Sequence, residues 1–481
     1  MFAARLLSVG TGLLFTLVIT RAVTKEQYGI WVNANTDIIP YFTLLSTALP
    51  FWVMRFVSRN REEAIKTGVV ANLILGLVST VFYVPLVPFI LSTLSVSNDY
   101  LPLYLFASIL IVEVYVLAAF EAILRVVKIE SLGYGLLIGE TIKVVTSYLL
   151  VFWSRQGLLG AMSALVISHL AQTLYYLHIC WGRLKGNVNW HYVKEWFKGS
   201  SANIYNIVGE RVYSFGLVLL FAIGRESARA YYGASSQIAS VVGYSSFLAF
   251  ALYPRLLLHE SSEDVVTALK LFLAFALPMT VGVVVLSDSY LTVLDVKYTV
   301  ASPVLQVMAL TVFTSTLSNI LDSIVFGIER FDFGAKISMR DLVKTKIFLI
   351  FSLPYAGSII VLPSVYTALK TVGENPLIAA FYTVLVMFFA NLVFLLVRCM
   401  LVRKAFSFSF PWKIVVKCLS ASAVMAALLL SIPHPTKLST TLGYTLVGGI
   451  VYLSTFIAID EDAKSTVKSV IKEVRVRLKF M

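Results

Sequence analysis

The chain has 481 residues, of which 58% are hydrophobic and 14% are charged. Soluble domains are about 45–50% apolar and about 25% charged, so this composition excludes a soluble or disordered protein. A membrane-spanning helix needs about 20 predominantly apolar residues. We therefore predict an all-α, polytopic membrane protein.

Fourteen apolar segments, separated by charged residues or by Gly, Pro and Asn, are predicted to span the membrane. They cover 6–20, 29–54, 67–94, 100–124, 132–153, 157–180, 200–223, 230–254, 270–287, 300–327, 347–367, 377–397, 414–432 and 441–459. The eleventh contains Pro354 and Pro363, which predict a kink or break, because proline interrupts helical hydrogen bonding.

Basic residues are distributed unevenly between the two sides of this map. The chain has 39 Lys and Arg against 26 Asp and Glu, a formal net charge of +13. Of the basic residues, 28 lie in or close to the connections on one side or in the C-terminal tail, and eight lie on the other side. Short cytoplasmic loops carry an excess of Lys and Arg. Both termini are therefore predicted to be cytoplasmic in a multi-pass protein of the cell membrane, and nucleic acid is not an expected partner.

The chain also contains an internal repeat. Three features recur at an offset of 204 residues, and they pair Arg21 with Arg225, Tyr28-Gly29 with Tyr232-Gly233, and Pro50 with Pro254. Six spans in each copy would give two parallel six-helix lobes around a central cavity. The predicted organisation is an N-terminal lobe over 1–182, an interfacial cytoplasmic linker over 183–199, a second lobe over 200–404, two further spans over 405–460, and a basic amphipathic cytoplasmic tail over 461–481.

Two segments have the pattern of helices that lie on a membrane surface. In the linker, Trp190, Val193, Trp196 and Phe197 follow helical spacing among Lys194 and Lys198. The tail alternates apolar and basic residues in the same way. Such segments are attracted to anionic lipids of the cytoplasmic leaflet, although a solvated basic tail is an equal alternative for 461–481.

Polar residues recur every three or four positions in the first, second, seventh and eighth spans. Because polar side chains are costly in lipid, they usually face a bundle interior or a water-filled cavity. These spans are equivalent pairs under the repeat, so the pattern predicts a polar cavity between the lobes. The residues expected to line it are Arg5, Asn33, Asp37, Asn203, Asn206, Glu210, Arg211 and Gln237. Helix packing is the alternative for the amide residues, and ion pairing is the alternative for Glu210.

A second set of intramembrane charges is a candidate for coupling transport to H⁺ or Na⁺. This set comprises Glu113, Glu121, Glu140, Lys143 and Asp322. Glu140 and Lys143 are three residues apart on one helix and alternatively neutralise each other. No bound cofactor is predicted.

Signatures of enzymes and metal sites are absent from the sequence. The five histidines show no paired-ligand spacing, the three cysteines form no CxxC motif, and no phosphate-binding P-loop occurs. No connection is long enough to form an extramembrane catalytic domain. We therefore expect neither an enzyme nor a metalloprotein.

Three segments of the chain carry a recognisable pattern. The N-terminal stretch reads RLLSVGTGLLFTLVITRAVTKEQYGIW. Its counterpart in the second half is SARAYYGASSQIASVVGYSSFLAFALYPRL. A third region contains YTVASPVLQVMALTVF followed by SIVFGIERF. Together, over roughly residues 1 to 400, these segments resemble the polysaccharide transporters, or O-antigen flippases, of the multidrug/oligosaccharidyl-lipid/polysaccharide exporter (MOP) superfamily.

This resemblance implies a V-shaped pair of six-helix lobes with the first, second, seventh and eighth spans lining the cavity. It also implies transfer of polyprenyl-diphosphate-linked oligosaccharides from the cytoplasmic to the outer leaflet by alternating access. Arg5 and Arg211 match the cavity cations that meet the diphosphate, while Arg21 and Arg225 match a motif at the outer mouth. The expected partners are the lipid-linked oligosaccharide, anionic membrane lipids and glycan-assembly enzymes.

Two other functions remain open at this point. The first is a cation-coupled exporter of small amphipathic drugs from the same superfamily, with Asp37, Glu210 or Asp322 at its ion site. The second is a non-catalytic scaffold of a glycan-assembly complex. Asp37 and Glu210 offset the cavity arginines, so the sequence does not define the glycan.

Overall fold

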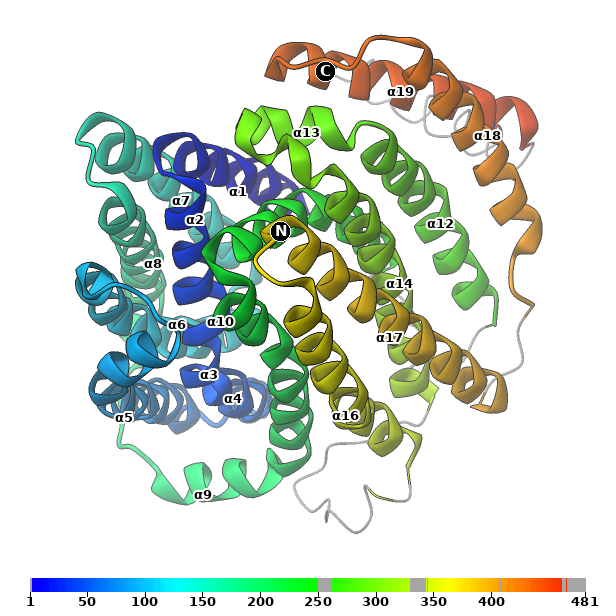
Figure 1. Ribbon diagram of the computed structural model, residues 1–481. Helices are drawn as coiled ribbons and strands as arrows, with labels where there is room; N and C mark the ends of the chain where they lie inside the picture. The colour runs from blue at the N-terminus through cyan, green and yellow to red at the C-terminus, as the bar shows by residue number, and fades with distance from the viewer. Residues whose placement is uncertain are drawn as a thin grey trace, which may run out of the picture. The chain divides into compact units, whose positions relative to one another are not determined.

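The computed structural model describes residues 2–249, 262–328, 343, 345–405, 409–460 and 464, and these residues contain helices but no strand. Figure 1 shows their arrangement within the chain. The Pro254-Arg255 end of the second repeat lies outside the described residues, and so does the predicted amphipathic tail apart from Lys464.

Each predicted span coincides with a helix in the described part of the chain, which confirms the all-α polytopic fold. Eleven helices are long and apolar enough to cross a membrane, a bent pair over 25–58 makes a twelfth, and Leu7–Ala22 is a shorter apolar helix. The main helices are α1 Phe2–Ala22, α2 Lys25–Val32, α3 Ile39–Phe42, α4 Ala48–Ser58, α5 Glu63–Thr93, α6 Leu101–Val127, α7 Ile129–Ser147, α8 Gly157–Cys180, α9 Trp190–Gly199, α10 Ser201–Gly243, α12 Ser262–Val285, α13 Ser287–Leu294, α14 Ser302–Ile328, α16 Lys346–Val372, α17 Pro376–Ala405, α18 Trp412–Ser431 and α19 Leu438–Ile459.

Two compact units emerge from the contacts within the chain. The first contains Met1–Ala234 and Phe331–Ala390, and the second contains Ser235–Arg330 and Asn391–Met481. Most of α10 and all of α16 thus group with the N-terminal helices, whereas the repeat places both in the second lobe. The lobe boundaries over 1–182 and 200–404 stay a prediction.

The second predicted span is a broken helix. Thr24 caps the start of α2 through a capping box with Gln27. The chain then widens into a π-helical turn over Asn33–Ile38, and the segments on either side of Thr43 are bent by 62°. Pro40 lies in this region and has no backbone N–H to donate. The π-helical turn leaves both Asn33 and Asp37 buried.

The seventh and eighth predicted spans meet at a sharp kink in α10. Arg225 has φ 71° and ψ −179° and joins two helical segments. A non-glycine residue rarely adopts this backbone region, at a cost of about 1–3 kcal/mol. The kink falls between the predicted spans 200–223 and 230–254. In contrast, α16 is a single helix that contains both Pro354 and Pro363, so the prolines do not divide the eleventh span.

Helices α2 and α10 approach closely through the two glycines of the repeated Tyr-Gly motif. A Cβ atom on Gly29 would collide with the backbone carbonyl of Glu226, and one on Gly233 would lie 3.0 Å from the Val32 side chain. Lys25 extends over the Tyr231 ring, with Nζ 5.5 Å from its centroid. The glycines of both copies of the Tyr-Gly motif therefore lie at the contact between α2 and α10.

Contacts between connections agree with the predicted alternation of sides. Asn189 Nδ2 donates to Glu63 Oε2 at 2.9 Å, which joins the connections after the second and sixth spans. His434 Nδ1 lies 2.8 Å from Asp288 Oδ2, which joins those after the ninth and thirteenth spans. Two connections that follow even-numbered spans meet, as do two that follow odd-numbered spans.

The predicted interfacial linker forms α9, but its apolar face is covered by protein. Trp196 is fully buried beside Trp52 and Phe56, while Trp190 is 56% exposed. Figure 1 shows α9 lying crosswise below the helices of its unit. The helix therefore contributes to the protein core as well as to the surface.

Candidate functional site

The predicted cavity residues are divided between the two units. Asn33, Asp37, Asn203, Asn206, Glu210 and Arg211 belong to the first unit, and Gln237 belongs to the second, where it is half-buried. The side chain of Arg5 lies outside the described residues. Their assignment to one cavity stays a prediction.

The N-terminal part of α10 carries four of these residues on successive turns. Asn206 Nδ2 donates to Glu210 Oε1 at 3.4 Å, and the Glu210 side chain is exposed. The next residue, Arg211, is half-buried. Tyr41 of α3 donates its hydroxyl hydrogen to the backbone carbonyl of Arg211 at 3.0 Å, which fixes the broken second span against α10.

Arg211 has no carboxylate partner among the residues that the structure describes. Its Nε–H group is buried and donates no hydrogen bond to any residue of the described chain. A guanidinium is charged at every physiological pH and presents five N–H donors in a planar fork. Arg211 is therefore a cation with unused hydrogen-bonding capacity in a helix that crosses the membrane.

Asp37 forms an ion pair with Arg229, a residue between the predicted spans 200–223 and 230–254. Arg229 donates from Nε to Asp37 Oδ2 at 2.8 Å and from Nη2 to Oδ1 at 2.7 Å. The exposed fractions of the two side chains are 2% and 1%. Asn33 and Tyr104 extend this group, because the Tyr104 hydroxyl donates to Asn33 Oδ1 at 2.8 Å. The ion pair thus ties the π-helical turn to α10.

The helical register of α10 explains why Arg229 was missed. The helix resumes directly after Arg225, so that Arg229 lies one turn inside it rather than in a loop. One feature of the sequence indicated that a cation was missing from this group. Asp37 is a charge without a partner in the second span, and the repeat pairs this span with the eighth. Arg398 was misplaced in the same way. It lies within α17 and donates from Nε to Asp322 Oδ1 at 2.7 Å.

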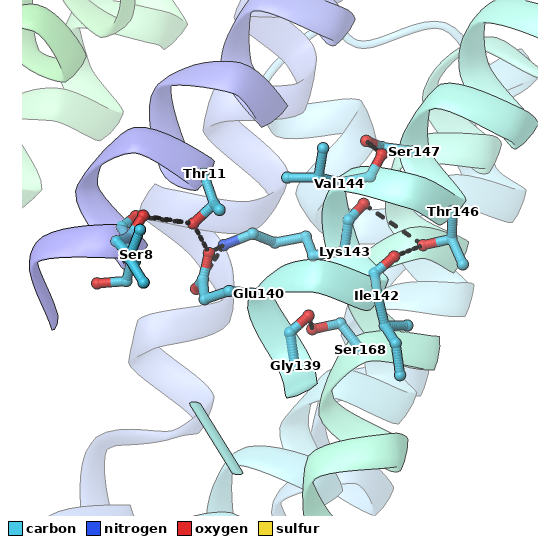
Figure 2. Close-up of polar contacts among 11 residues, drawn as sticks. Ser8, Thr11, Gly139, Glu140, Ile142, Lys143, Val144, Thr146, Ser147 and Ser168 are labelled. Carbon is cyan, nitrogen blue, oxygen red and sulfur yellow. Dashed lines mark hydrogen bonds and ion pairs between the residues drawn. The ribbon is translucent and has the colours of Figure 1, made fainter. Parts of the chain in front are cut away.

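A third polar group connects α1, α7 and α8. Lys143 Nζ lies 2.6 Å from Glu140 Oε2, and Thr11 Oγ1 donates to the same carboxylate. These contacts confirm the alternative that Glu140 and Lys143 neutralise each other. Figure 2 shows Lys143 reaching back along α7 toward Glu140 and Thr11 approaching from α1, with Ser168 of α8 donating to the carbonyl of Gly139.

The remaining predicted residues differ in their surroundings. Glu113 of α6 is buried, with Oε2 4.0 Å from His169 Nδ1 of α8, and Glu121 is half-buried on the same helix. Arg21 ends α1 and Arg225 forms the kink of α10, and both are exposed. No group of three or more His, Cys, Asp or Glu in the described ranges could hold a metal ion.

Comparison with known proteins gives the fold from solved structures only, since the chain matches no protein-family model and no curated protein. The chain is similar to a multidrug resistance MATE family transporter of the MOP superfamily in an inward-facing conformation. The TM-score is 0.62 at 13% identity, and the match covers 83% of this chain and 95% of the transporter. The chain is also similar to the lipid II flippase MurJ in an inward closed conformation. The TM-score is 0.62 at 17% identity, and the match covers 96% of this chain and 99% of MurJ. The chain has the fold of MOP-superfamily transporters.

A further structure with this fold is described as having a different binding pocket. A MOP-superfamily transporter from Pyrococcus furiosus, described as having a binding pocket of reversed polarity, has a TM-score of 0.52 at 12% identity and covers 83% of this chain and 96% of its own. The structural neighbours are thus transporters and a flippase. Together with the apolar helices, they establish a multi-pass membrane protein.

Proposed function

We propose that the protein is a flippase for polyprenyl-diphosphate-linked oligosaccharides and moves them from the cytoplasmic to the outer leaflet by alternating access. The observation that carries this proposal is Arg211, a half-buried guanidinium without a carboxylate partner among the described residues. A diphosphate is the ligand chemistry that this group fits, because a guanidinium forks onto phosphate oxygens and charge-assisted bonds of this kind are strong.

The amides around Arg211 suit the sugar part of such a substrate. Asn203 and Asn206 lie one to two turns before Arg211 on the same helix, and both are half-buried. Amide groups both donate and accept hydrogen bonds, as sugar hydroxyls do. The polyprenyl chain needs no polar site and would remain in the lipid during transfer.

The extent of the match to the flippase also supports the proposal. The match to MurJ covers 96% of this chain. Helices α18 and α19 contain 20 and 22 residues, which together exceed the part of the chain that the match leaves out. The match to MurJ therefore includes much of these two helices. The matches to MATE structures cover 82–84% of this chain, so both helices can lie outside them.

The location and partners follow from the same proposal. A precursor made on the cytoplasmic face requires a flippase in the cell membrane, and the excess of Lys and Arg supports cytoplasmic termini. Anionic lipids would bind the basic tail over 461–481, which lies outside the described residues except for Lys464. Glycan-assembly enzymes would supply and consume the substrate.

Transfer between leaflets tests this function directly. The purified protein would be reconstituted in liposomes that contain a fluorescent polyprenyl-diphosphate oligosaccharide, and its movement would be measured with and without proton or sodium gradients. We expect wild type and Arg183→Ala, a change of an exposed arginine on a connection, to transfer the lipid. Arg211→Ala should transfer the lipid about ten- to a hundredfold more slowly while inserting normally. Normal transfer by Arg211→Ala would overturn the assigned role.

The second candidate is a cation-coupled exporter of amphipathic organic cations. It is favoured by the MATE transporters among the structural neighbours and by Glu113, a buried carboxylate whose Oε2 lies 4.0 Å from His169 Nδ1. Gradient-driven movement of an organic cation, without transfer of any lipid-linked oligosaccharide, would select this function. If neither moved, but the protein captured glycan-assembly enzymes in lipid, the scaffold function would be selected instead.

A further inference from the structure

Glu113 and His169 face each other across two helices without forming a hydrogen bond. Glu113 Oε2 on α6 and His169 Nδ1 on α8 are 4.0 Å apart. Both atoms are buried, and neither has a hydrogen-bond partner among the described residues. Buried polar atoms are nearly always paired, so two facing unpaired atoms on neighbouring helices call for an explanation.

The charged groups around this pair come from a small number of helices. On α7, Lys143 and Glu140 form a salt bridge, and Figure 2 shows this bridge beside Ser168, the residue before His169. On α1, Thr11 donates a hydrogen bond to the Glu140 carboxylate and does not titrate. Since Lys143 and Glu140 cancel each other, the charge of the whole cluster is set by Glu113 and His169.

We propose that Glu113 and His169 form a proton-exchange site within the first unit. In the empty state the carboxylate is ionised, the imidazole is neutral and the cluster carries a charge of −1. One proton taken up at His169 Nε2, with the proton on Nδ1 passed to Glu113 Oε2, leaves a neutral carboxylic acid and the other neutral tautomer of the imidazole. The cluster then carries no charge, and no other reactant is required.

The chemistry of the pair favours a proton over a metal ion. One imidazole nitrogen and one carboxylate offer too few ligands for a metal, and the described chain gathers no third His, Cys, Asp or Glu here. The relative exposure of the two side chains also fits a relay. His169 is 28% exposed and Glu113 is 10% exposed, so the imidazole is the accessible member that receives the proton and hands it on.

Infrared difference spectroscopy on the full-length protein in lipid tests the site without any transported substrate. A pH jump should produce the carbonyl band of a protonated carboxylic acid in wild type, in Glu130→Gln and in His178→Gln, the last two being changes of exposed residues at the start of α7 and on α8. Glu113→Gln should lose this band. His169→Gln should keep it and slow its appearance by at least about tenfold, since the accessible relay group is gone. An unchanged band in Glu113→Gln would overturn the proposal.

The role of this site in transport rests on the proposed function and has a separate test. Coupling to one proton changes the equilibrium distribution of the substrate between the two leaflets by about tenfold per pH unit. A proton gradient should therefore accelerate transfer by wild type and Glu130→Gln, while Glu113→Gln should respond less than about twofold and still transfer without a gradient. Full acceleration of Glu113→Gln would exclude coupling through this pair. If no lipid-linked substrate moves in wild type, the proposed function fails, but the infrared experiment still decides on the proton site.

Discussion

Two arginines on α10 illustrate different uses of a charge inside a membrane protein. Arg229 is 2% exposed and holds Asp37 through two short hydrogen bonds. Arg211 is half-buried and has no carboxylate partner in the described part of the chain. Both belong to one helix and to one compact unit. The two arginines differ in whether a carboxylate pairs with them. The carboxylate that pairs with Arg229 is Asp37, which lies far from α10 in the sequence.

The physical consequence of this difference is a division between structure and binding. A buried arginine with a bidentate carboxylate has little left to offer a ligand, and its removal leaves an uncompensated charge. An arginine with an unused Nε retains the donors that an anionic substrate needs. A charged residue in a span is therefore a candidate for binding only after its protein partners are known.

Breaking the structural pair should have the largest effect. Arg229→Ala would leave Asp37 buried without its cation, and we expect a loss of about 3–5 kcal/mol in stability. The measurement is the thermal unfolding midpoint in detergent, together with the amount of protein in the membrane. The double variant Asp37→Leu with Arg229→Met should recover most of the stability, because it removes both charges. Normal unfolding of the single variant would show that the pair is not structural.

The packing that brings the pair together should be nearly as sensitive. A Cβ on Gly29 would collide with the carbonyl of Glu226, so Gly29→Ala should force α2 away from α10 at a cost of about 1–3 kcal/mol. Gly449→Ala is the control, since its added Cβ would meet nothing within 4 Å. Equal unfolding midpoints for the two variants would contradict the close packing of α2 on Glu226.

Arg211→Ala should affect transport without affecting folding. Loss of hydrogen bonds to a charged group costs about 1.5–3 kcal/mol, so transfer of the lipid-linked substrate should fall by about ten- to a hundredfold. The unfolding midpoint should stay close to that of wild type. Arg211→Lys, which keeps the charge but loses the planar fork, should recover part of the rate. A large drop in stability would instead place Arg211 with Arg229 among the structural residues.

The smallest effect is expected at the exposed carboxylate next to Arg211. Glu210 accepts a hydrogen bond from Asn206 but has no cationic partner among the described residues. Removing its negative charge with Glu210→Gln should favour an anionic substrate by about 0.2–1 kcal/mol, an up to fivefold increase in apparent affinity. The effect should fade at high salt. A decrease in affinity would indicate that the carboxylate binds the substrate directly.

Much of the fold could be predicted from the sequence, because apolar length and charge placement depend on the bilayer rather than on tertiary contacts. The fourteen spans and the Glu140–Lys143 pair follow from such local rules. Arg229 and Arg398 were misplaced because each lies just outside a predicted apolar span, and hydropathy does not show that the helix continues past the apolar residues. Trp196 was assigned to lipid because an amphipathic helix looks the same whether lipid or protein covers it. The kink at Arg225 has no sequence signal, since arginine does not favour positive φ.

The Asp37–Arg229 pair also has a consequence for how the protein is made. The two residues are 192 positions apart, and synthesis proceeds at about 5–20 residues per second, so Asp37 waits roughly 10–40 s for its arginine. An unpaired aspartate near the middle of a span costs about 2.5–3.5 kcal/mol during insertion. We therefore expect the second span to be inserted less stably until α10 has been made and its arginine pairs with Asp37.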